Sequence, residues 1–245
     1  MKNILIIDSG VGAISIANEI RKIVNANLYV YIDNKNAPLG EKNEKVLKQI
    51  AYNILKRNIK KYKIDLVVLA CNTLTVGTIS FLRENFNILI VGTEPNVKIK
   101  DLPAIVFCTS FTYKNCKLIN ESKLDKIALP KLATLIDKNL QDLSILSDYF
   151  MRFYNKLKDY KAISLGCTHY TFIKEIINKI FPNIKIYENK FGVANRVKYL
   201  LENCKFNKVI FKGKRIFKRK GKGRIKLILS KQNSKFKMSL KNYLK

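Results

Sequence analysis

The sequence predicts an α/β fold of two similar, doubly wound units, whose mostly parallel sheets face each other across a cleft. Three observations predict it: short apolar runs alternate with longer amphipathic stretches, the alternation occurs twice along the 245 residues, and polar residues follow the apolar runs. Strands that alternate with helices favour parallel pairing, because each return to the sheet crosses over through a helix. The hydrophobic content of 47% indicates a buried core.

The first series of elements runs from the N-terminus to residue 91. Its expected strands are the apolar runs Ile4–Ile7, Leu28–Ile32, Leu66–Leu69 and Ile88–Val91. Its expected helices carry apolar residues at helical spacing and cover Ile14–Val24, Glu41–Ile59 and Val76–Phe86. The segment from Gly92 to Pro103, which contains two prolines, is expected to connect this series to the next.

The second series repeats the pattern. Its expected strands are Ala104–Phe107, Lys126–Leu129, Ala162–Leu165 and Ile184–Tyr187. Its expected helices are Ser144–Leu157, Phe172–Ile180 and Val193–Leu201. Towards the C-terminus we expect a strand at Ile225–Leu229 and a helix at Phe236–Leu244. The basic stretch before them is expected to form a β-hairpin, with its turns at Gly213 or at Gly221 and Gly223.

Composition excludes several classes of protein. No apolar run approaches the roughly 20 residues that span a bilayer. The first run, which stops at Asp8, is too short for the apolar core of a signal peptide, so we expect a cytoplasmic protein without a membrane partner. The five cysteines are irregularly spaced and form no C-x-x-C pair, which argues against a disulfide framework and a structural zinc site. His169 is the only histidine, which removes every mechanism or metal site that needs two.

The formal net charge is +29. One hypothesis is that this charge binds nucleic acid or another anionic surface. The hypothesis that we favour is solvated surface charge, because the lysines are scattered over helical faces in a chain dominated by Lys, Asn and Ile. Only the stretch from Lys208 to Lys226 is locally dense in basic residues.

Cysteines and short polar residues follow several of the expected strands. In open α/β sheets, ligands bind beyond the carboxyl ends of the strands, so these residues are the candidates for a site. The strand-end segments are Asp8-Ser9-Gly10, Ala70-Cys71-Asn72-Thr73, Cys108-Thr109-Ser110 and Gly166-Cys167-Thr168-His169. Two of them are alike: Cys71 and Cys167 each follow a small residue at a strand end and precede polar residues that lead into a helix. This is a weak internal repeat.

The two similar cysteines suit proton transfer on both sides of one carbon. The exposed N–H groups at a helix start favour a thiolate, and a usual pKa of about 8.5 makes cysteine a usable base after modest tuning. Racemisation needs this geometry, because one base removes the α-proton from one face and a conjugate acid returns a proton on the other. Nearby donors could hold the substrate carboxylates, and the candidates are Ser9, Asn72, Thr73, Thr109 and Thr168.

Simpler interpretations compete with this one. A single buried cysteine is more often part of the core than catalytic, but the matching placement of two cysteines after strands is harder to explain by packing. Asp8 is equally well explained as a turn cap, and His169 as a helix-start residue without chemistry. We interpret the remaining cysteines as structural, and these are Cys108, Cys116 and Cys204.

Five segments resemble the glutamate racemase family. They are Ile7-Asp8-Ser9-Gly10-Val11-Gly12, Pro38-Leu39-Gly40-Glu41-Lys42, Ala70-Cys71-Asn72-Thr73, Glu94-Pro95 and Leu165-Gly166-Cys167-Thr168-His169-Tyr170. They occur in the family's order and at compatible spacing across nearly the whole chain. The resemblance implies interconversion of L- and D-glutamate without pyridoxal phosphate, another cofactor or a metal, and a supply of D-glutamate for peptidoglycan synthesis.

The resemblance also implies roles for particular residues. Cys71 and Cys167 match the two catalytic thiols, Asp8 assists Cys71, His169 assists Cys167, and Asp137 falls where the family carries a glutamate. The positions that match substrate-binding residues are Ser9, Pro38, Leu39, Gly40, Asn72, Thr73, Thr112 and Thr168. The implied domains are residues 1–97 plus 207–245, which make a discontinuous first unit, and residues 98–206. The implied site lies in the cleft between them.

Four residues depart from the family's pattern. Leu39 stands where the family usually has tyrosine, Ala13 replaces a glycine, Cys108 replaces a glycine before Thr109, and Asp137 is one methylene shorter than glutamate. Ala13 would strain its turn if the backbone φ there were positive.

Three other functions stay open at this point. They are a racemase of another acid such as aspartate, a catalytically impaired relative that binds nucleic acid, and a cysteine hydrolase, which would leave Cys71 idle. The sequence also leaves both a monomer and a homodimer open.

Overall fold

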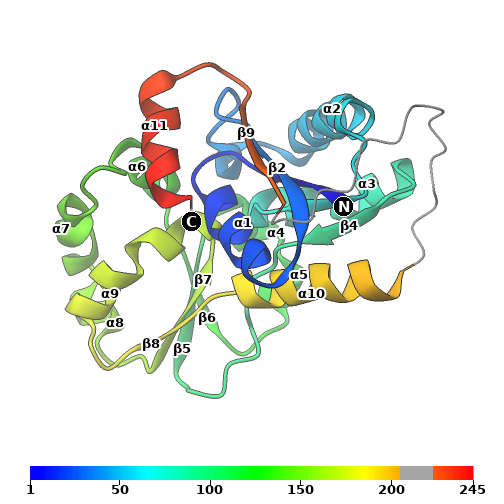
Figure 1. Cartoon of the computed structure of the whole chain (residues 1–245). Helices are drawn as coiled ribbons and strands as arrows, with labels where there is room; N and C mark the ends of the chain where they lie inside the picture. Colours follow the sequence, from blue (N-terminus) through cyan, green and yellow to red (C-terminus); the bar gives the residue numbers. More distant parts are fainter. Residues whose placement is uncertain (205–222, 245) are drawn as a thin grey trace.

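The computed structural model describes residues 1–204 and 223–244, which form two β-sheets with helices packed around them (Figure 1). The first sheet has the order β4-β3-β1-β2-β9. Its strands are β1 (Lys2–Asp8), β2 (Ala26–Ile32), β3 (Leu66–Leu69), β4 (Leu89–Gly92) and β9 (Ile225–Leu229). The second sheet has the order β6-β5-β7-β8. Its strands are β5 (Ala104–Cys108), β6 (Asp125–Ala128), β7 (Ala162–Gly166) and β8 (Lys185–Tyr187).

Every strand pair in the two sheets is parallel, which confirms the predicted fold class. Read from its other edge, the second sheet has the order β8-β7-β5-β6, which repeats the order β4-β3-β1-β2 of the first. The two halves therefore share one topology. Strand β3, before Cys71, and strand β7, before Cys167, occupy equivalent places in the two halves.

The longer helices cover both faces of the sheets. They are α1 (Gly12–Ile23), α2 (Glu44–Tyr62), α3 (Asn72–Asn85) and α10 (Lys190–Asn203). Most of the remaining helices are short, and they are α4 (Ser110–Asn115), α5 (Lys117–Asn120), α6 (Leu132–Lys138), α7 (Ser147–Met151), α8 (Tyr154–Leu157), α9 (Lys174–Ile180) and α11 (Ser234–Tyr243). The 3₁₀ helices are η1 (Leu39–Glu41), η2 (Ser144–Leu146) and η3 (Thr168–Ile173).

Strand β1 shows why the first sheet is buried on both faces. Successive side chains of a strand point to opposite faces. Ile4 and Ile6 belong to the core that contains α1 and α10, which pack against each other. Leu5 and Ile7 belong to a second core that contains α2 and α3. The first of these cores continues into the second sheet, so one apolar cluster joins the two halves.

The strands expected within the described residues are all present, with ends shifted by one or two residues at most. The single helix expected from Ser144 to Leu157 is wrong. The chain forms η2, α7 and α8 there, because the backbone leaves helical geometry at Phe153, whose φ is −98° and ψ is 1°. The expected helix from Phe172 starts instead as η3 and becomes α-helical at Lys174.

The C-terminal segment returns to the first sheet. Strand β9 pairs with β2 along its whole length, from Leu28 beside Ile225 to Ile32 beside Leu229. Helix α11 then reaches both halves, because Asn18 of α1 donates a hydrogen bond to the Tyr243 carbonyl and the Tyr243 hydroxyl donates one to Leu140 O at 2.5 Å.

Two predictions fall wholly or partly on residues that are not described. The expected β-hairpin and most of the stretch from Lys208 to Lys226 lie outside the described residues. Among the helices in the described part of the chain, none has the length and apolar character that a membrane span requires.

Candidate active site

The two cysteines of the repeated loops line one cavity. Cys71 follows β3 and occupies the position before α3, and Cys167 follows β7 and occupies the position before η3, so each half contributes one thiol. Both side chains are buried and both line a cavity of about 40 Å³, which we call the cysteine cavity. The two strands belong to different sheets, so the carboxyl end of one strand in each sheet contributes to this cavity, although the two cysteines are almost a hundred positions apart.

Nine of the thirteen predicted site residues line the cysteine cavity. They are Ser9, Pro38, Leu39, Gly40, Cys71, Thr73, Asp137, Cys167 and His169. The other four are buried but do not line it, and they are Asp8, Asn72, Thr112 and Thr168. Thr109, a candidate carboxylate donor, and Ser110, from the same strand-end segment, also line it. The lining residues that had not been proposed for the site are Ala37, Glu41, Leu129, Pro130, Lys131, Ala133 and Thr134. Leu129, Pro130 and Lys131 follow the end of β6, so the strand-end rule would have found them on that weaker strand.

Asp8 links the two halves behind the cysteine cavity. Its Oδ2 accepts a hydrogen bond from the Thr168 hydroxyl at 2.8 Å, and its Oδ1 accepts one from the Ser9 N–H at 2.6 Å. Gly12 makes this contact sterically possible, because a Cβ on Gly12 would lie 2.3 Å from both Asp8 Oδ2 and Thr168 Oγ1. Burial raises the pKa of Asp8, while His169 and the two hydrogen bonds act in the opposite direction.

His169 and Asp137 form a second link. His169 Nε2 lies 3.2 Å from Asp137 Oδ2, and Asp137 Oδ1 accepts a hydrogen bond from the Val11 N–H at 2.9 Å. Asp137 therefore reaches His169 despite being shorter than glutamate. Gly10 leaves room for the pair, because a Cβ there would lie 2.0 Å from Asp137 Oδ2 and 2.3 Å from His169 Nε2.

The charges around His169 favour its protonated form. Burial alone would lower the pKa of His169, but the nearby Asp137 carboxylate, its hydrogen bond, and contacts with Cys167 and Asp8 raise this pKa well above its usual value. His169 Nδ1 lies 3.8 Å from the Cys167 sulfur. An imidazolium next to a sulfur favours negative charge on that sulfur.

Cys71 lies in the opposite electrostatic situation. Burial and the Asp8 carboxylate raise the pKa of the Cys71 thiol well above its usual value, while the backbone N–H groups of Leu74 and Thr73 act to lower it. The helix start therefore acts in the predicted direction, but the tuning towards a thiolate that the sequence suggested is wrong for Cys71 in this state. Desolvation outweighs the helix terminus, so Cys71 is a neutral thiol here.

Hydroxyl and amide groups complete the site. Thr73 Oγ1 and Thr109 Oγ1 lie 3.0 Å apart across the two halves, and the Thr109 hydroxyl donates to Thr112 Oγ1 at 3.1 Å. Among the described residues, neither amide atom of the buried Asn72 side chain has a hydrogen-bond partner, and Asn72 does not itself line the cysteine cavity. A buried amide without partners is costly.

Two residues that depart from the family's pattern fit without strain. Ala13 lies inside α1, away from the two described non-glycine residues with positive φ, Lys63 and Lys131. Cys108 is a buried core thiol, and burial raises its pKa to about 12, as expected of a structural cysteine. Within residues 1–204 and 223–244, no group of three or more His, Cys, Asp or Glu side chains is arranged to hold a metal ion.

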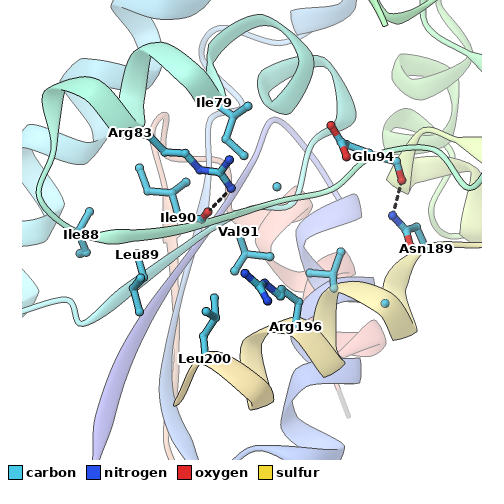
Figure 2. Close-up of a pocket in the computed structure, with 13 residues that line it drawn as sticks. Ile79, Arg83, Ile88, Leu89, Ile90, Val91, Glu94, Asn189, Arg196 and Leu200 are labelled. Atoms are coloured by element: carbon cyan, nitrogen blue, oxygen red, sulfur yellow. Dashed lines mark hydrogen bonds between the residues drawn. The ribbon is translucent and has the colours of Figure 1, made fainter. Parts of the chain in front are cut away.

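A larger cavity of about 610 Å³ lies between α3, β4 and α10 and shares no lining residue with the cysteine cavity (Figure 2). Its polar groups include Arg83, which donates to Ile90 O at 2.8 Å, and Asn189, which donates to Glu94 O. It contains neither a thiol nor an imidazole.

The fold and the site together define a class. Two topologically equivalent parallel α/β halves present one thiol each to a shared cavity, with a carboxylate behind one thiol and a cationic imidazole behind the other. This arrangement defines an α/β protein with groups suited to general acid–base chemistry on both sides of one cavity.

Comparison with known proteins identifies the family within that class. A glutamate racemase of Clostridium acetobutylicum is 32% identical over 220 residues, covering 80% of this chain and 83% of that protein. One of Leptospira interrogans is 33% identical over 227 residues, covering 85% of each. No family model matches the chain. On the evidence of these relatives, the chain belongs to the glutamate racemase family, whose members are isomerases.

Solved structures agree in fold. Escherichia coli glutamate racemase, in complex with L-glutamate and the activator UDP-MurNAc-Ala, superposes with a TM-score of 0.81 at 22% identity and covers 99% of this chain and 95% of that chain. A glutamate racemase isoform from Bacillus anthracis superposes with a TM-score of 0.79 at 21% identity, covering 99% and 94%.

Proposed function

We propose that this enzyme interconverts L- and D-glutamate by moving the α-proton between Cys71 and Cys167, without a cofactor. The observation that carries the proposal is that both thiols, at equivalent strand ends of two repeated halves, line the same cavity. A carbon acid held between two such groups loses its proton to one and regains a proton from the other on the opposite face.

The electrostatics favour one starting state. Cys71, whose pKa is raised, keeps its proton and is the acid, while the Cys167 sulfur beside cationic His169 is the base. Proton transfer from the α-carbon to Cys167 and from Cys71 to the opposite face inverts the stereocentre. The reverse reaction starts with the two protonation states exchanged. Asp8 and His169 are then positioning and tuning groups, and Asp137 holds His169 in place.

Polar groups of both halves would hold the substrate. Carboxylate groups suit the N–H groups at the start of α3 and the hydroxyls of Ser9 and Thr73. An ammonium group suits the hydroxyl oxygens and the amide oxygen of Asn72. The cavity has a volume of about 40 Å³, so we expect its walls, which the Thr73–Thr109 contact joins, to separate when an amino acid enters.

We further propose that the D-glutamate supplies peptidoglycan synthesis in the cytoplasm, and that residues 1–97 plus 207–245 and residues 98–206 are the two domains. The pairing of β9 with β2 supports the discontinuous first domain. The boundary at 206–207 lies outside the described residues, and α10, which this division gives to the second domain, packs against α1. Homodimerisation and binding of nucleic acid stay hypotheses.

The test is incubation of the purified protein with each glutamate enantiomer in deuterated water. We expect formation of the other enantiomer, detected by polarimetry, together with incorporation of deuterium at the α-carbon, detected by mass spectrometry. Absence of both from folded protein, as judged by circular dichroism, would reject the proposal.

Aspartate is a second candidate substrate, and Leu39 is the observation that favours it. The Leu39 side chain is buried and gives the cysteine cavity an apolar wall where the family usually has a hydroxyl. Comparison of kcat/KM for the two acids decides between them, and we expect glutamate to be the better substrate.

A further inference from the structure

A third cavity, of about 490 Å³, adjoins the cysteine cavity, and we call it the antechamber. Five residues line both cavities, and they are Ser9, Ala37, Pro38, Thr134 and Asp137. The two spaces therefore share a wall beside the proposed chemistry. The volume of the antechamber is more than ten times that of the cysteine cavity. The antechamber therefore has room for a substrate beside the cysteine cavity.

The antechamber is positively charged. Three exposed lysines line it, Lys138, Lys231 and Lys235, and none of them has an ion-pair partner within the described ranges. Its acidic lining residue is Asp137, whose oxygens are already bonded to the Val11 N–H and to His169. The lysine charges are therefore left uncompensated within this hollow.

The start of α11 adds to this positive potential. Asn233 caps the helix by accepting the Phe236 N–H at 2.9 Å, and both residues line the antechamber. The first turn carries no acidic residue, and Lys235 lies in it instead. A cation is unfavourable beside the positive end of a helix dipole, so this turn places two positive sources together at some cost in stability.

Backbone contacts fix the position of Lys231. Its N–H donates to Asn34 Oδ1 at 2.9 Å, and its carbonyl accepts from Asn34 Nδ2 at 2.8 Å. The side chain takes part in neither contact. A substitution at Lys231 can therefore change the charge of the antechamber without removing what holds the loop.

We propose that the antechamber is a binding site for small dicarboxylates, which gathers the substrate anion before it enters the cysteine cavity. This proposal rests on the proposed function. A dicarboxylic amino acid carries a net negative charge at neutral pH, and the cysteine cavity is flanked by two carboxyl groups, those of Asp8 and Asp137. A concave surface of opposite charge offsets that repulsion and raises the local concentration of substrate.

The test is a double charge reversal, Lys231→Glu with Lys235→Glu. The matched control is Lys45→Glu with Lys179→Glu, two exposed lysines on α2 and α9 that line none of the three cavities and change the net charge equally. At low salt we expect the antechamber variant to lose about five-fold in kcat/KM, mainly through KM, and the control to lose less than two-fold. At about 0.5 M salt the difference should disappear, because the Debye length falls to a few ångströms.

Calorimetric titration with D-glutamate at low salt gives a second measurement that needs no turnover. We expect weaker binding to the antechamber variant than to the control, and a smaller loss for the variant with Lys231→Gln and Lys235→Gln, which also serves if the reversal does not fold. Equal kinetics and equal affinity of both folded charge-changed proteins would overturn the antechamber. If the wild-type protein exchanges no α-hydrogen, the proposed function fails, and the titration still decides whether the antechamber binds a dicarboxylate.

Discussion

The two halves share one strand order but treat their thiols differently. Cys71 is followed by a regular helix of 14 residues and has the Asp8 carboxylate nearby, so its pKa is raised. Cys167 is followed by a 3₁₀ helix that carries His169, a group held cationic by Asp137. The repeated topology sets where the two thiols lie, while the residues beside each thiol set its charge.

This difference shows how two halves with one topology can give their two thiols different proton affinities. Two thiols in identical surroundings would hold their protons equally, whereas here burial and Asp8 raise the pKa of Cys71 and a cationic imidazole lies 3.8 Å from the Cys167 sulfur. The asymmetry depends on contacts that cross between the halves, namely Asp8 with Thr168 and Asp137 with Val11. The following variants test it in order of expected effect.

The largest effect is expected from removal of either thiol. Cys71→Ala and Cys167→Ala should each lower racemisation about 10³-fold or more, because general acid and base groups contribute about 10²- to 10⁴-fold and neither side can replace the other. Racemisation followed by polarimetry measures this. Cys204→Ala, at the end of α10, is the control and should stay near wild type. If one thiol proved dispensable, the two halves would not be partners.

Gly10→Ala should act through the crossing contacts. Its Cβ would lie 2.0 Å from Asp137 Oδ2, and because the blocking atoms are side-chain ends, the pair should shift rather than the backbone unfold. We expect kcat/KM to fall about 10- to 100-fold with little loss of thermal stability, since misplacement by about 1 Å can cost 100-fold. Gly192→Ala in α10, whose Cβ would meet only Asn189, should remain active. An active Gly10→Ala enzyme would mean that the His169–Asp137 geometry is unimportant.

Asp137→Asn should lower the pKa of His169, because it removes the carboxylate that favours the imidazolium. His169 is the only histidine, so its imidazole signal in a proton NMR titration is unambiguous. We expect wild-type His169 to titrate well above its usual pKa and the variant to titrate lower. Because the folded pKa is raised, the stabilisation from protonated His169 is complete below the unfolded value of about 6.5 and is lost as pH rises through the folded pKa. Identical titrations in the two proteins would remove Asp137 from the explanation.

Asp8→Asn should have the smallest effect, and it tests the surroundings of Cys71. The variant removes a negative charge that raises the pKa of Cys71, so the Cys71 thiolate should form at lower pH. The rate of Cys71 alkylation by iodoacetamide against pH, followed by peptide mass spectrometry, measures this. Asp148→Asn, at an exposed position in α7, should leave the profile unchanged. A shift to higher pH would contradict the assigned direction.

The sequence predicted most strands well because they are short apolar runs that end at polar or glycine residues, as in β1, β2 and β4, whereas β6 is the weaker strand with two charged residues. It predicted the segment from Ser144 to Leu157 poorly, since buried Leu146, Phe150 and Leu157 have helical spacing whether or not the backbone bends between them. Helices of four to seven residues, such as α4 and α6, are too short to show a period.

The site was predictable where it depends on local sequence motifs. It was not predictable where it depends on contacts between residues far apart in the sequence. Cys71 and Cys167 were found from their matching loops, and both line the same cavity. The raised pKa of Cys71 was not predicted, because it follows from complete burial and from Asp8, which come from tertiary structure. The need for Gly10 and Gly12 was likewise hidden, since the atoms that would clash belong to residues more than 120 positions away or to Asp8.

The position of β9 has a consequence for biosynthesis. Strand β2 has its outer backbone groups paired only when residues 225–229 arrive, some 200 positions after β2 itself. While the ribosome is still translating the intervening chain, that edge is open to pairing with another nascent polypeptide. We therefore expect chaperones to bind the open edge of β2 during synthesis. Among the described strands of the first sheet that precede β9, only β4, which is itself an edge strand, leaves its outer backbone groups unpaired for longer.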